Sequence, residues 1–246
     1  MEKHFIFDVD GTLTPSRGEM DGEFKQWFTN FCAYNNVYLV TGSDKLKTVE
    51  QIGSVIFGMC QKSYNCSGND VYQFGVNIHK SEWKLTQEQK NWLNEKLDSS
   101  VWETKTGLHL EERTGCANFS IVGRNADFEQ RKLYYTWDCK TKERETISKE
   151  FNETFTEVEA KIGGETGFDI FPKGKDKLQI LEDFPSTDKV YFFGDRVDPA
   201  GNDYTLARGV LKHGDWKNGK VYHVGDWEET FRILKTDLKN IIQGIV

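Results

Sequence analysis

Short apolar strands that alternate with helices occupy both ends of the chain, and this order restricts the fold more than any other feature. Strands are predicted at His4–Val9 and Val37–Val40, with a helix of regularly spaced apolar residues between them at Gly22–Asn35. A further helix follows the capping residue Asp44, and another buried strand is predicted at Lys189–Phe193. This order predicts an α/β fold with a doubly wound, Rossmann-like parallel sheet, whose ligands bind beyond the carboxyl ends of the strands.

The middle of the chain interrupts this alternation. Charged helices and a hairpin replace the pattern of strand and crossover helix. The predicted elements there are a helix opened by the capping-box residues Thr86–Gln89, strands at Leu108–Glu112 and Asn118–Val122, a helical region from Asp127 to Phe155, and a strand at Gly167–Pro172. We therefore expect an inserted α+β cap domain at residues 82–175, between core segments 1–81 and 176–246.

Charge and composition exclude several classes of protein. The net charge of −7 argues against broad nucleic-acid binding. No apolar run approaches the roughly 20 residues that a membrane span needs, and the first residues turn acidic too early for a signal peptide. The five cysteines are odd in number and lack metal-binding spacing, which predicts free thiols. We expect a cytoplasmic protein that binds neither nucleic acid nor membrane.

Two carboxylates, Asp8 and Asp10, directly follow the first predicted strand. Bringing them together is costly unless a cation neutralises them or they exchange protons with a substrate. Gly11, the next residue, permits a tight turn and a close approach by a ligand. The alternative is that both acids only cap a turn. The pattern favours metal-assisted or acid–base chemistry at this strand end.

These residues resemble the first motif of the haloacid dehalogenase superfamily, an apolar strand followed by DxDGT. The further motifs of that superfamily follow in order along the chain. They are a hydroxyl after the second strand (Thr41 or Ser43), a lysine that opens a later helix (Lys177), and acidic residues after the last buried strand (Asp195, with Asp203). Four matches in the expected order indicate a phosphoryl-transfer enzyme of this superfamily.

The resemblance implies a role for each of these residues. Asp8 would attack phosphorus and become an aspartyl phosphate, and Asp10 would act as general acid and base. Asp8, the carbonyl group of Asp10 and Asp195 would bind Mg²⁺, which prefers oxygen ligands. Ser43 and Lys177 would hold the phosphate oxygens.

Within the superfamily, the chain resembles the eukaryotic-type phosphomannomutases over most of residues 1–208. The run FDVDGTLTPSR places Arg17 where that family has a phosphate-contacting arginine. The GSD triplet that contains Ser43, the run GFDIFPKGKDK and the run GDRVDPAGNDY resemble further motifs of the family. Asp169, within the second of these runs, matches the acid that binds the sugar in that family.

Three arginines of the predicted cap carry the closest likeness. Arg113, Arg124 and Arg131 are 11 and 7 residues apart (124 − 113 and 131 − 124), as in the family pattern. The resemblance implies that they bind the phosphate that is not reacting, since a guanidinium fork suits a phosphate dianion. The alternative is a solvated face of salt bridges, which is the usual place of an arginine near glutamates.

The family resemblance implies a mutase that interconverts mannose 6-phosphate and mannose 1-phosphate, for GDP-mannose biosynthesis, through an aspartyl phosphate. It further implies a hexose 1,6-bisphosphate as intermediate and activator, and a homodimer formed through the cap. Thr41 and Gly167 depart from the family, which has glycine and serine there, and they favour an alternative, a sugar phosphatase of the same superfamily. A catalytically silent binding or scaffold protein is a third interpretation. The choice between mannose and glucose stays open.

Overall fold

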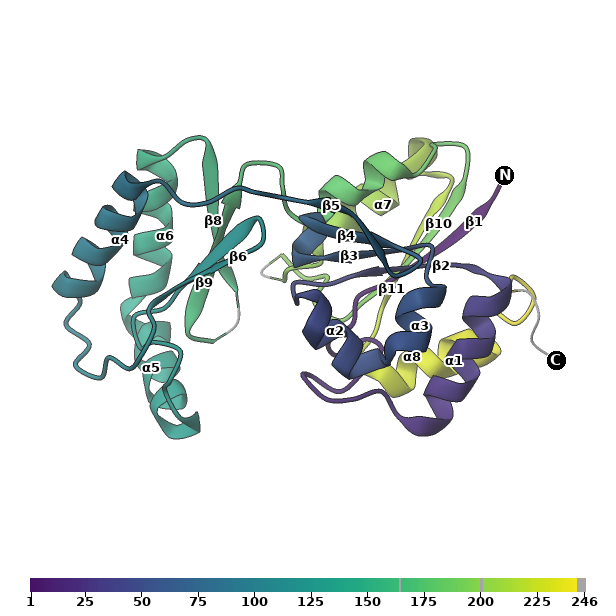
Figure 1. Ribbon diagram of the computed structural model, residues 1–246, viewed down its shortest axis with the longest axis horizontal. Coiled ribbons are helices and arrows are strands. Elements are labelled where there is room, and N and C mark those ends of the chain that lie inside the picture. Colours follow the sequence, from purple (N-terminus) through teal and green to yellow (C-terminus); the bar gives the residue numbers. More distant parts are fainter. Residues whose placement is uncertain (164, 200, 243–246) are drawn as a thin grey trace. The chain divides into compact units, whose positions relative to one another are not determined.

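Two units make up the chain (Figure 1). The computed structural model describes residues 1–163, 165–199 and 201–242. One unit, here the core unit, consists of Met1–Lys80 and Lys175–Val246, and the other, the inserted unit, is Ser81–Gly174. Across the described residues, no helix combines the length and the apolar character that a membrane crossing needs.

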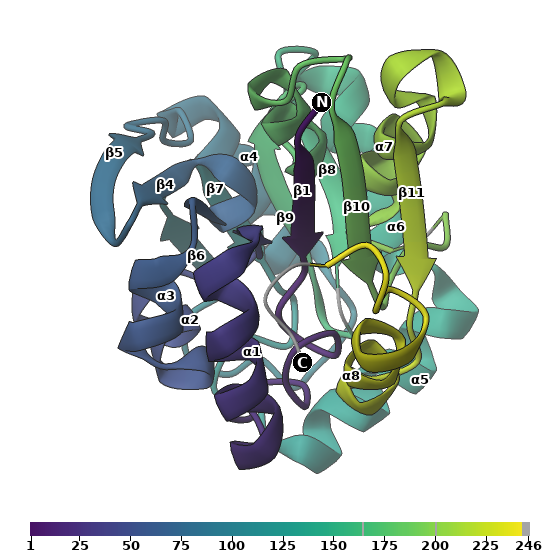
Figure 2. The ribbon, with the colours of Figure 1, turned by 90° about the vertical axis from the view of Figure 1, so that its right-hand side faces the viewer.

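The core unit is built on a mixed sheet of order β11-β10-β1-β2-β3-β4-β5. The first five strands in this order are parallel, as the β1, β10 and β11 arrows in Figure 2 illustrate. Strand β4 then pairs antiparallel with β3, and β5 pairs antiparallel with β4. The strands are β1 (Lys3–Phe7), β2 (Asn36–Val40), β3 (Lys62–Asn65), β4 (Asp70–Gln73), β5 (Val76–Lys80), β10 (Lys189–Gly194) and β11 (Gly219–His223). This arrangement confirms the predicted α/β fold class.

Helices cover both faces of this sheet (Figure 1). They are α1 (Gly22–Tyr34), α2 (Lys45–Ile52), α3 (Ser54–Met59), α7 (Tyr204–Trp216) and α8 (Trp227–Thr236), with 3₁₀ turns η1 (Cys66–Gly68) and η2 (Lys177–Asp183). Phe5 and Phe7 of β1 pack with α1 and α8, whereas Ile6 packs with α7. Each such buried side chain stabilises the fold by about 1.5–3 kcal/mol, which fixes β1 in the centre of the sheet.

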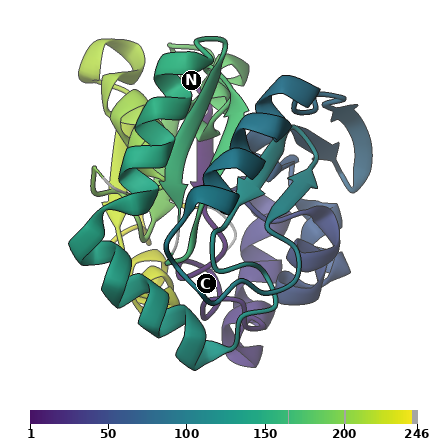
Figure 3. The ribbon, with the colours of Figure 1, turned by 90° about the vertical axis from the view of Figure 1, so that its left-hand side faces the viewer.

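The inserted unit is an antiparallel sheet of order β6-β7-β9-β8 with helices packed against it (Figure 3). Its elements are α4 (Gln87–Ser99), β6 (Leu110–Arg113), β7 (Cys116–Phe119), α5 (Phe128–Thr141), α6 (Glu143–Thr154), β8 (Val158–Gly163) and β9 (Gly167–Pro172). Leu93 of α4 and Phe151 of α6 share an apolar core with Phe119 and Phe168 of the sheet. The predicted capping box is present, because Thr86 and Gln89 hydrogen-bond each other's backbone.

Two predicted helices are broken in the structure. The helix predicted after Asp44 ends at Ile52, because Gly53, whose φ of 86° lies in the left-handed region, separates it from a second helix that contains Ile56. The helical region from Asp127 to Phe155 is broken at Lys142, which has a φ of 59°. The strands β3, β4, β5, β8 and β11 had not been predicted. All five residues of β5 are exposed, so that strand carries no alternation of buried and exposed positions.

Candidate active site

Asp8 lies immediately beyond β1, at the carboxyl edge of the parallel sheet. Its backbone N–H donates to the carbonyl group of Phe193 at 2.9 Å, and this bond continues the pairing of β1 with β10. Asp195 follows β10 by one residue. Because neighbouring parallel strands end at the same edge, the two aspartates meet there, as the doubly wound topology predicts.

Lys177, the first residue of η2, lies between two buried carboxylates. Its ammonium group is 2.6 Å from Asp8 Oδ1 and 2.7 Å from Asp203 Oδ1. Burial by itself lowers the pKa of Lys177, but the Asp203 and Asp8 carboxylates outweigh burial and raise it. Lys177 therefore stays charged, beside the side chain predicted to be the nucleophile.

Among the described residues, Asp8, Asp195 and Asp203 each offer one carboxylate oxygen within 4.8 Å of the others. A Cβ at Gly11 would lie 2.5 Å from Asp195 Oδ2, and a Cβ at Gly194 would lie 2.7 Å from Asp203 Oδ2, so both glycines leave room for these carboxylates. Three carboxylates beside one ammonium leave negative charge uncompensated. Burial raises the pKa of Asp8 and that of Asp195, and the Asp203 carboxylate raises both further.

This oxygen-rich, anionic group fits a hard divalent cation such as Mg²⁺. Asp203 joins the two predicted carboxylates, Asp8 and Asp195, in this group. The third predicted ligand, the backbone carbonyl group of Asp10, stays a prediction.

The side chain of Asp10 is held by a set of hydrogen bonds. Its Oδ1 accepts from the backbone N–H of Arg17 at 2.7 Å and from Gln51 Nε2 at 2.9 Å. Its Oδ2 accepts from the Ser43 hydroxyl group at 3.4 Å. The structure thus joins Asp10 and Ser43. The Thr41 hydroxyl group accepts from the Ser43 backbone N–H at 3.1 Å, so Ser43 is the residue that turns its hydroxyl group toward Asp10.

Arg17 contacts the site through its backbone only. Its side chain is exposed, its φ is 59°, and its carbonyl group accepts from Lys47 Nζ at 3.1 Å. The left-handed conformation turns the Arg17 N–H toward Asp10, which is a contact that the sequence analysis did not predict.

In the inserted unit, Glu111 connects two of the predicted arginines. Its Oε2 lies 2.7 Å from Arg113 Nη2 and 2.8 Å from Arg124 Nη2. Burial alone raises the pKa of Glu111, yet the bonds to Arg113 and the charge of Arg124 lower it overall. Asp169 acts on the same pair, since burial alone lowers the pKa of Arg113, but Glu111 and Asp169 raise it overall. Two guanidinium groups held side by side suit a phosphate dianion as ligand.

Asp169 belongs to the same face of the inserted sheet. Strand register places Glu111 opposite Asn118, and Asn118 opposite Asp169. Asn118 Nδ2 donates to Asp169 Oδ1 at 2.8 Å, and Arg124 Nη1 donates to Asn118 Oδ1 at 3.4 Å. Since side chains alternate across a strand, the apolar neighbours of these residues face the helices. With Arg113, which pairs with Glu111, five polar side chains from three strands and a loop thus form one network.

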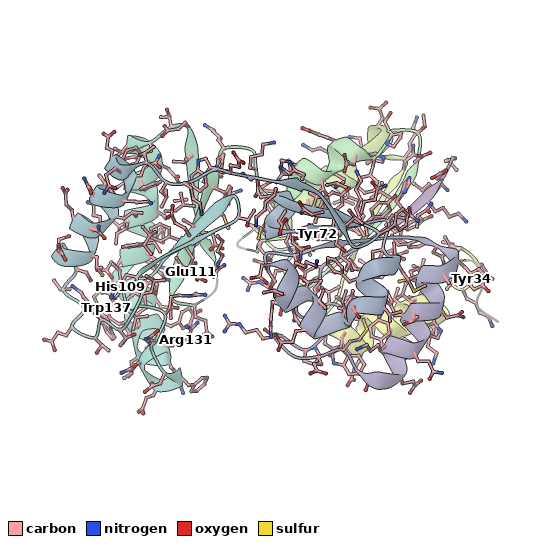
Figure 4. The ribbon with its side chains drawn as sticks, viewed as in Figure 1. Tyr34, Tyr72, His109, Glu111, Arg131 and Trp137 are labelled. Carbon is pink, nitrogen blue, oxygen red and sulfur yellow. The ribbon has the colours of Figure 1, made fainter. Side chains whose placement is uncertain are left out.

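Arg131 lies on α5, and Figure 4 labels it together with Glu111 of β6. Its side chain is half-buried and makes no ion pair or side-chain hydrogen bond among the described residues. The structure therefore joins Arg113, Arg124 and Asp169, and leaves Arg131 outside their network.

Gly167 has no room for the serine that the family carries there. A Cβ at this position would lie 2.7 Å from the carbonyl oxygen of Phe119, which is a backbone atom and cannot swing aside. The hydroxyl contact that such a serine would make is therefore absent from this site.

Sequence reasoning missed Gln51, Glu111 and Asn118. Each had a weak signal in the sequence. Asn118 stands between the apolar Ala117 and Phe119 in a strand, and Gln51 lies one residue before the buried Ile52 of α2. A polar residue inside a buried apolar run needs a hydrogen-bond partner, which is a reason to suspect a network.

Two solved structures with similar folds are distant from this chain in sequence. The C-terminal domain of Candida albicans trehalose-6-phosphate phosphatase matches with a TM-score of 0.61 and 17% identity, covering 92% of this chain and 80% of that one. A haloacid dehalogenase-like hydrolase from Bacteroides thetaiotaomicron matches with a TM-score of 0.59 and 12% identity, covering 95% of this chain and 100% of that one. These likenesses support the haloacid dehalogenase fold alone.

Sequence relatives are closer. The phosphomannomutase of Encephalitozoon cuniculi is 30% identical over 98% of this chain and 95% of its own. The phosphomannomutases of Spinacia oleracea and Saccharomyces cerevisiae are 33% and 31% identical, each over 82% of this chain and 84% and 83% of their own. The sequence model of the family described as eukaryotic phosphomannomutase matches residues 24–212. The chain therefore belongs to the eukaryotic phosphomannomutase family.

Proposed function

We propose that the chain is a phosphomannomutase, which interconverts mannose 6-phosphate and mannose 1-phosphate and so supplies a precursor for GDP-mannose. The observation that carries this proposal is that this member of the family has two groups of side chains with different tasks toward a phosphate. A buried carboxylate, Asp8, lies against Lys177, and a pair of guanidinium groups, those of Arg113 and Arg124, lies in the inserted unit. The first group suits phosphoryl transfer, and the second suits a phosphate that is only held.

The core unit would carry out the covalent step. A carboxylate oxygen of Asp8 attacks phosphorus, the bond between phosphorus and the sugar oxygen breaks, and an aspartyl phosphate forms. Asp10 donates a proton to the departing sugar oxygen and, in the second half-reaction, removes a proton from the incoming hydroxyl group. Lys177 and the Ser43 hydroxyl group would stabilise charge on the transferring phosphoryl oxygens. The ion pair of Lys177 with Asp203 keeps the lysine in place.

Mg²⁺ is proposed as the cofactor, with Asp8, Asp195 and the carbonyl group of Asp10 as its ligands and the Asp203 carboxylate beside them. When bound, it would neutralise these carboxylates and the phosphate, and thereby lower the repulsion between two anions. The support is the buried group of three carboxylates with a single ammonium.

The inserted unit would retain the intermediate. After the first transfer to a monophosphate, the sugar is a hexose 1,6-bisphosphate, and it must turn around before its other phosphate returns to Asp8. Arg113, Arg124 and Arg131 would bind the phosphate that is not reacting, and Asp169 would bind sugar hydroxyl groups. Glu111 removes one positive charge from the pair that it joins. A hexose 1,6-bisphosphate would also prime the enzyme by phosphorylating Asp8.

A paired assay tests the proposal. Purified protein with mannose 1-phosphate, Mg²⁺ and a catalytic amount of hexose 1,6-bisphosphate is expected to form mannose 6-phosphate, with little free phosphate. Chelation of the metal should stop the reaction, and added Mg²⁺ should restore it. Release of phosphate without any mannose 6-phosphate would instead support the sugar phosphatase, an alternative favoured by Thr41 and Gly167. The same assay with glucose 1-phosphate measures the sugar preference.

We also propose a homodimer formed through the inserted unit. On α5, Phe128, Leu133 and Tyr135 are exposed although they are large and apolar, at 82%, 57% and 42% of their surface. Exposed apolar side chains on one helix are typical of a contact surface. Sedimentation equilibrium should give the mass of two chains, and a Phe128→Ser variant should shift it toward one. A single-chain mass for the unaltered protein at micromolar concentration would refute this proposal.

A cytoplasmic location is proposed because none of the five cysteines, all of which lie among the described residues, forms a disulfide. Thiols persist in reducing compartments, whereas secreted proteins tend to form disulfides. Fluorescence microscopy of the tagged chain in its own cell would check this, and a signal confined to a secretory compartment would contradict it.

A further inference from the structure

A fully buried glutamine, Gln51, reaches the proposed acid–base residue from α2. Its side chain has no exposed surface. Its Nε2 donates to Asp10 Oδ1 at 2.9 Å and to Thr14 Oγ1 at 3.2 Å. Its backbone carbonyl group accepts from the Met20 N–H at 2.8 Å, which holds this turn of α2 against the loop that follows Asp10.

Only one orientation of the Gln51 amide is chemically consistent. With the amide reversed, its oxygen would face the Asp10 carboxylate, and two acceptors would then repel each other. The Thr14 hydroxyl group donates to the carbonyl groups of Val9 and Pro15, so it is an acceptor toward Gln51. Both N–H groups of the amide are therefore used.

The oxygen of the same amide is left without a partner. Gln51 Oε1 is buried and has no hydrogen-bond donor among the described residues. A buried acceptor without a donor destabilises a fold, and an apolar side chain of the same length would avoid that cost. A residue that breaks a local rule in this way is expected at a functional site.

The two oxygens of Asp10 are consequently different. Oδ1 accepts two bonds, from Gln51 and from the Arg17 backbone, at 2.9 and 2.7 Å. Oδ2 has only the longer contact with Ser43, at 3.4 Å. N–H donors occupy the lone pairs of Oδ1, so a proton carried by this carboxyl group must sit on Oδ2.

We propose that Gln51 is a positioning residue for Asp10, which fixes the carboxyl group so that Oδ2 carries the transferred proton. The inference rests on the proposed function of Asp10. In the step concerned, an Asp8 oxygen forms a bond to phosphorus and the bond from phosphorus to the sugar oxygen breaks. The sugar oxygen keeps the electron pair and takes the proton from Asp10 Oδ2. Without Gln51, the carboxyl group can rotate and the proton is delivered less often.

The test compares two phosphoryl donors in a Gln51→Met variant, which keeps the length of the side chain and removes its N–H groups. Mannose 1-phosphate has a leaving oxygen that needs a proton, whereas the leaving group of 2,4-dinitrophenyl phosphate does not. General acid catalysis contributes about 10²–10⁴-fold. We therefore expect about a 10²-fold slower reaction with mannose 1-phosphate, in kcat more than in KM, and a rate within about threefold for the dinitrophenolate burst. The burst amplitude counts folded active sites.

Two controls separate positioning from a structural role. Gln89→Met makes the same change at another buried glutamine, in the inserted unit, and should leave both rates unaltered. Asp10→Asn should show the same dependence on the leaving group, and adding Gln51→Met to it should slow the reaction no further, because two residues that act through one proton transfer are not additive.

Equal slowing with both donors would overturn the proposal, and so would unaltered rates with both. The comparison does not depend on isomerisation. If the unaltered protein only hydrolyses mannose 1-phosphate, the proposed mutase function fails, but the same bond to the sugar oxygen is still broken. The leaving-group comparison would then decide the role of Gln51 separately.

Discussion

An Asp8→Asn variant is expected to lose isomerisation by about 10⁴- to 10⁶-fold, because an amide cannot form the aspartyl phosphate. The shape of the side chain is retained, and Lys177 keeps its ion pair with Asp203 at 2.7 Å. Residual activity is measured as mannose 6-phosphate formed per active site. Acid-quenched protein should also carry no acid-stable, hydroxylamine-sensitive phosphate.

The same substitution should not weaken the fold. Burial raises the pKa of Asp8, so the ionised form is less favourable in the folded protein than in the unfolded chain at neutral pH. Removing that charge is expected to leave the midpoint of thermal unfolding equal or higher, as is common for active-site residues. Asp98→Asn, an exposed aspartate of α4, is the matched control and should keep full activity. Isomerisation within tenfold of the unaltered rate in Asp8→Asn would refute the nucleophile.

Arg113→Ala and Arg124→Ala are each expected to lower kcat/KM for isomerisation by about 10²-fold. A hydrogen bond to a charged group contributes about 1.5–3 kcal/mol, which corresponds to a factor of about 10–150. The loss of isomerisation should be accompanied by hexose bisphosphate in solution, because the intermediate dissociates before the second phosphoryl transfer. Hydrolysis of a small aryl phosphate, which has no second phosphate to hold, should change less than about threefold.

A lysine of the inserted unit provides the control for the two arginine variants. Lys132 is exposed on α5, next to Arg131, and Lys132→Ala should leave isomerisation unaltered. Arg131→Ala tests whether the third arginine contributes to isomerisation although it lies outside the network of Glu111. If Arg113→Ala and Arg124→Ala slow the aryl phosphate reaction as much as isomerisation, the two arginines do not serve a second phosphate.

Parts of the fold could be predicted from the sequence, because the patterns that specify them depend only on residues close together in the chain. The apolar run of β1 and the helical spacing of α1 were recognised, and the structure has them at Lys3–Phe7 and Gly22–Tyr34. The capping box of α4 needs only Thr86 and Gln89. By contrast, β5 is exposed along its whole length, and it exists through its pairing with β4. Pairing between strands leaves no mark in such a sequence.

Some features of the site could be predicted from the sequence, and others depend on how the elements pack. The resemblance to the haloacid dehalogenase superfamily implied that Asp8 and Asp195 lie together, and the parallel strands that carry them end at the same sheet edge. The choice of Ser43 over Thr41, the joining of Asp203 to the carboxylate group, and the bonds of Gln51 and Glu111 needed the packed structure. Gln51 and Asp10 are 41 residues apart, and their bond forms only when α2 packs beside the loop after β1.

By itself, the sequence determined the α/β class, the strand end that carries the carboxylates and the family to which the chain belongs. The first two follow from residue spacing, which local sterics and burial translate directly into secondary structure. The family follows from the motifs that the chain shares with it. The tertiary structure alone decided which polar atoms face each other, and therefore how Asp10 is oriented and which charge joins Arg113 to Arg124. Such contacts depend on distances of a few tenths of an ångström between elements remote in the chain, and a hydrogen bond exists only within that range.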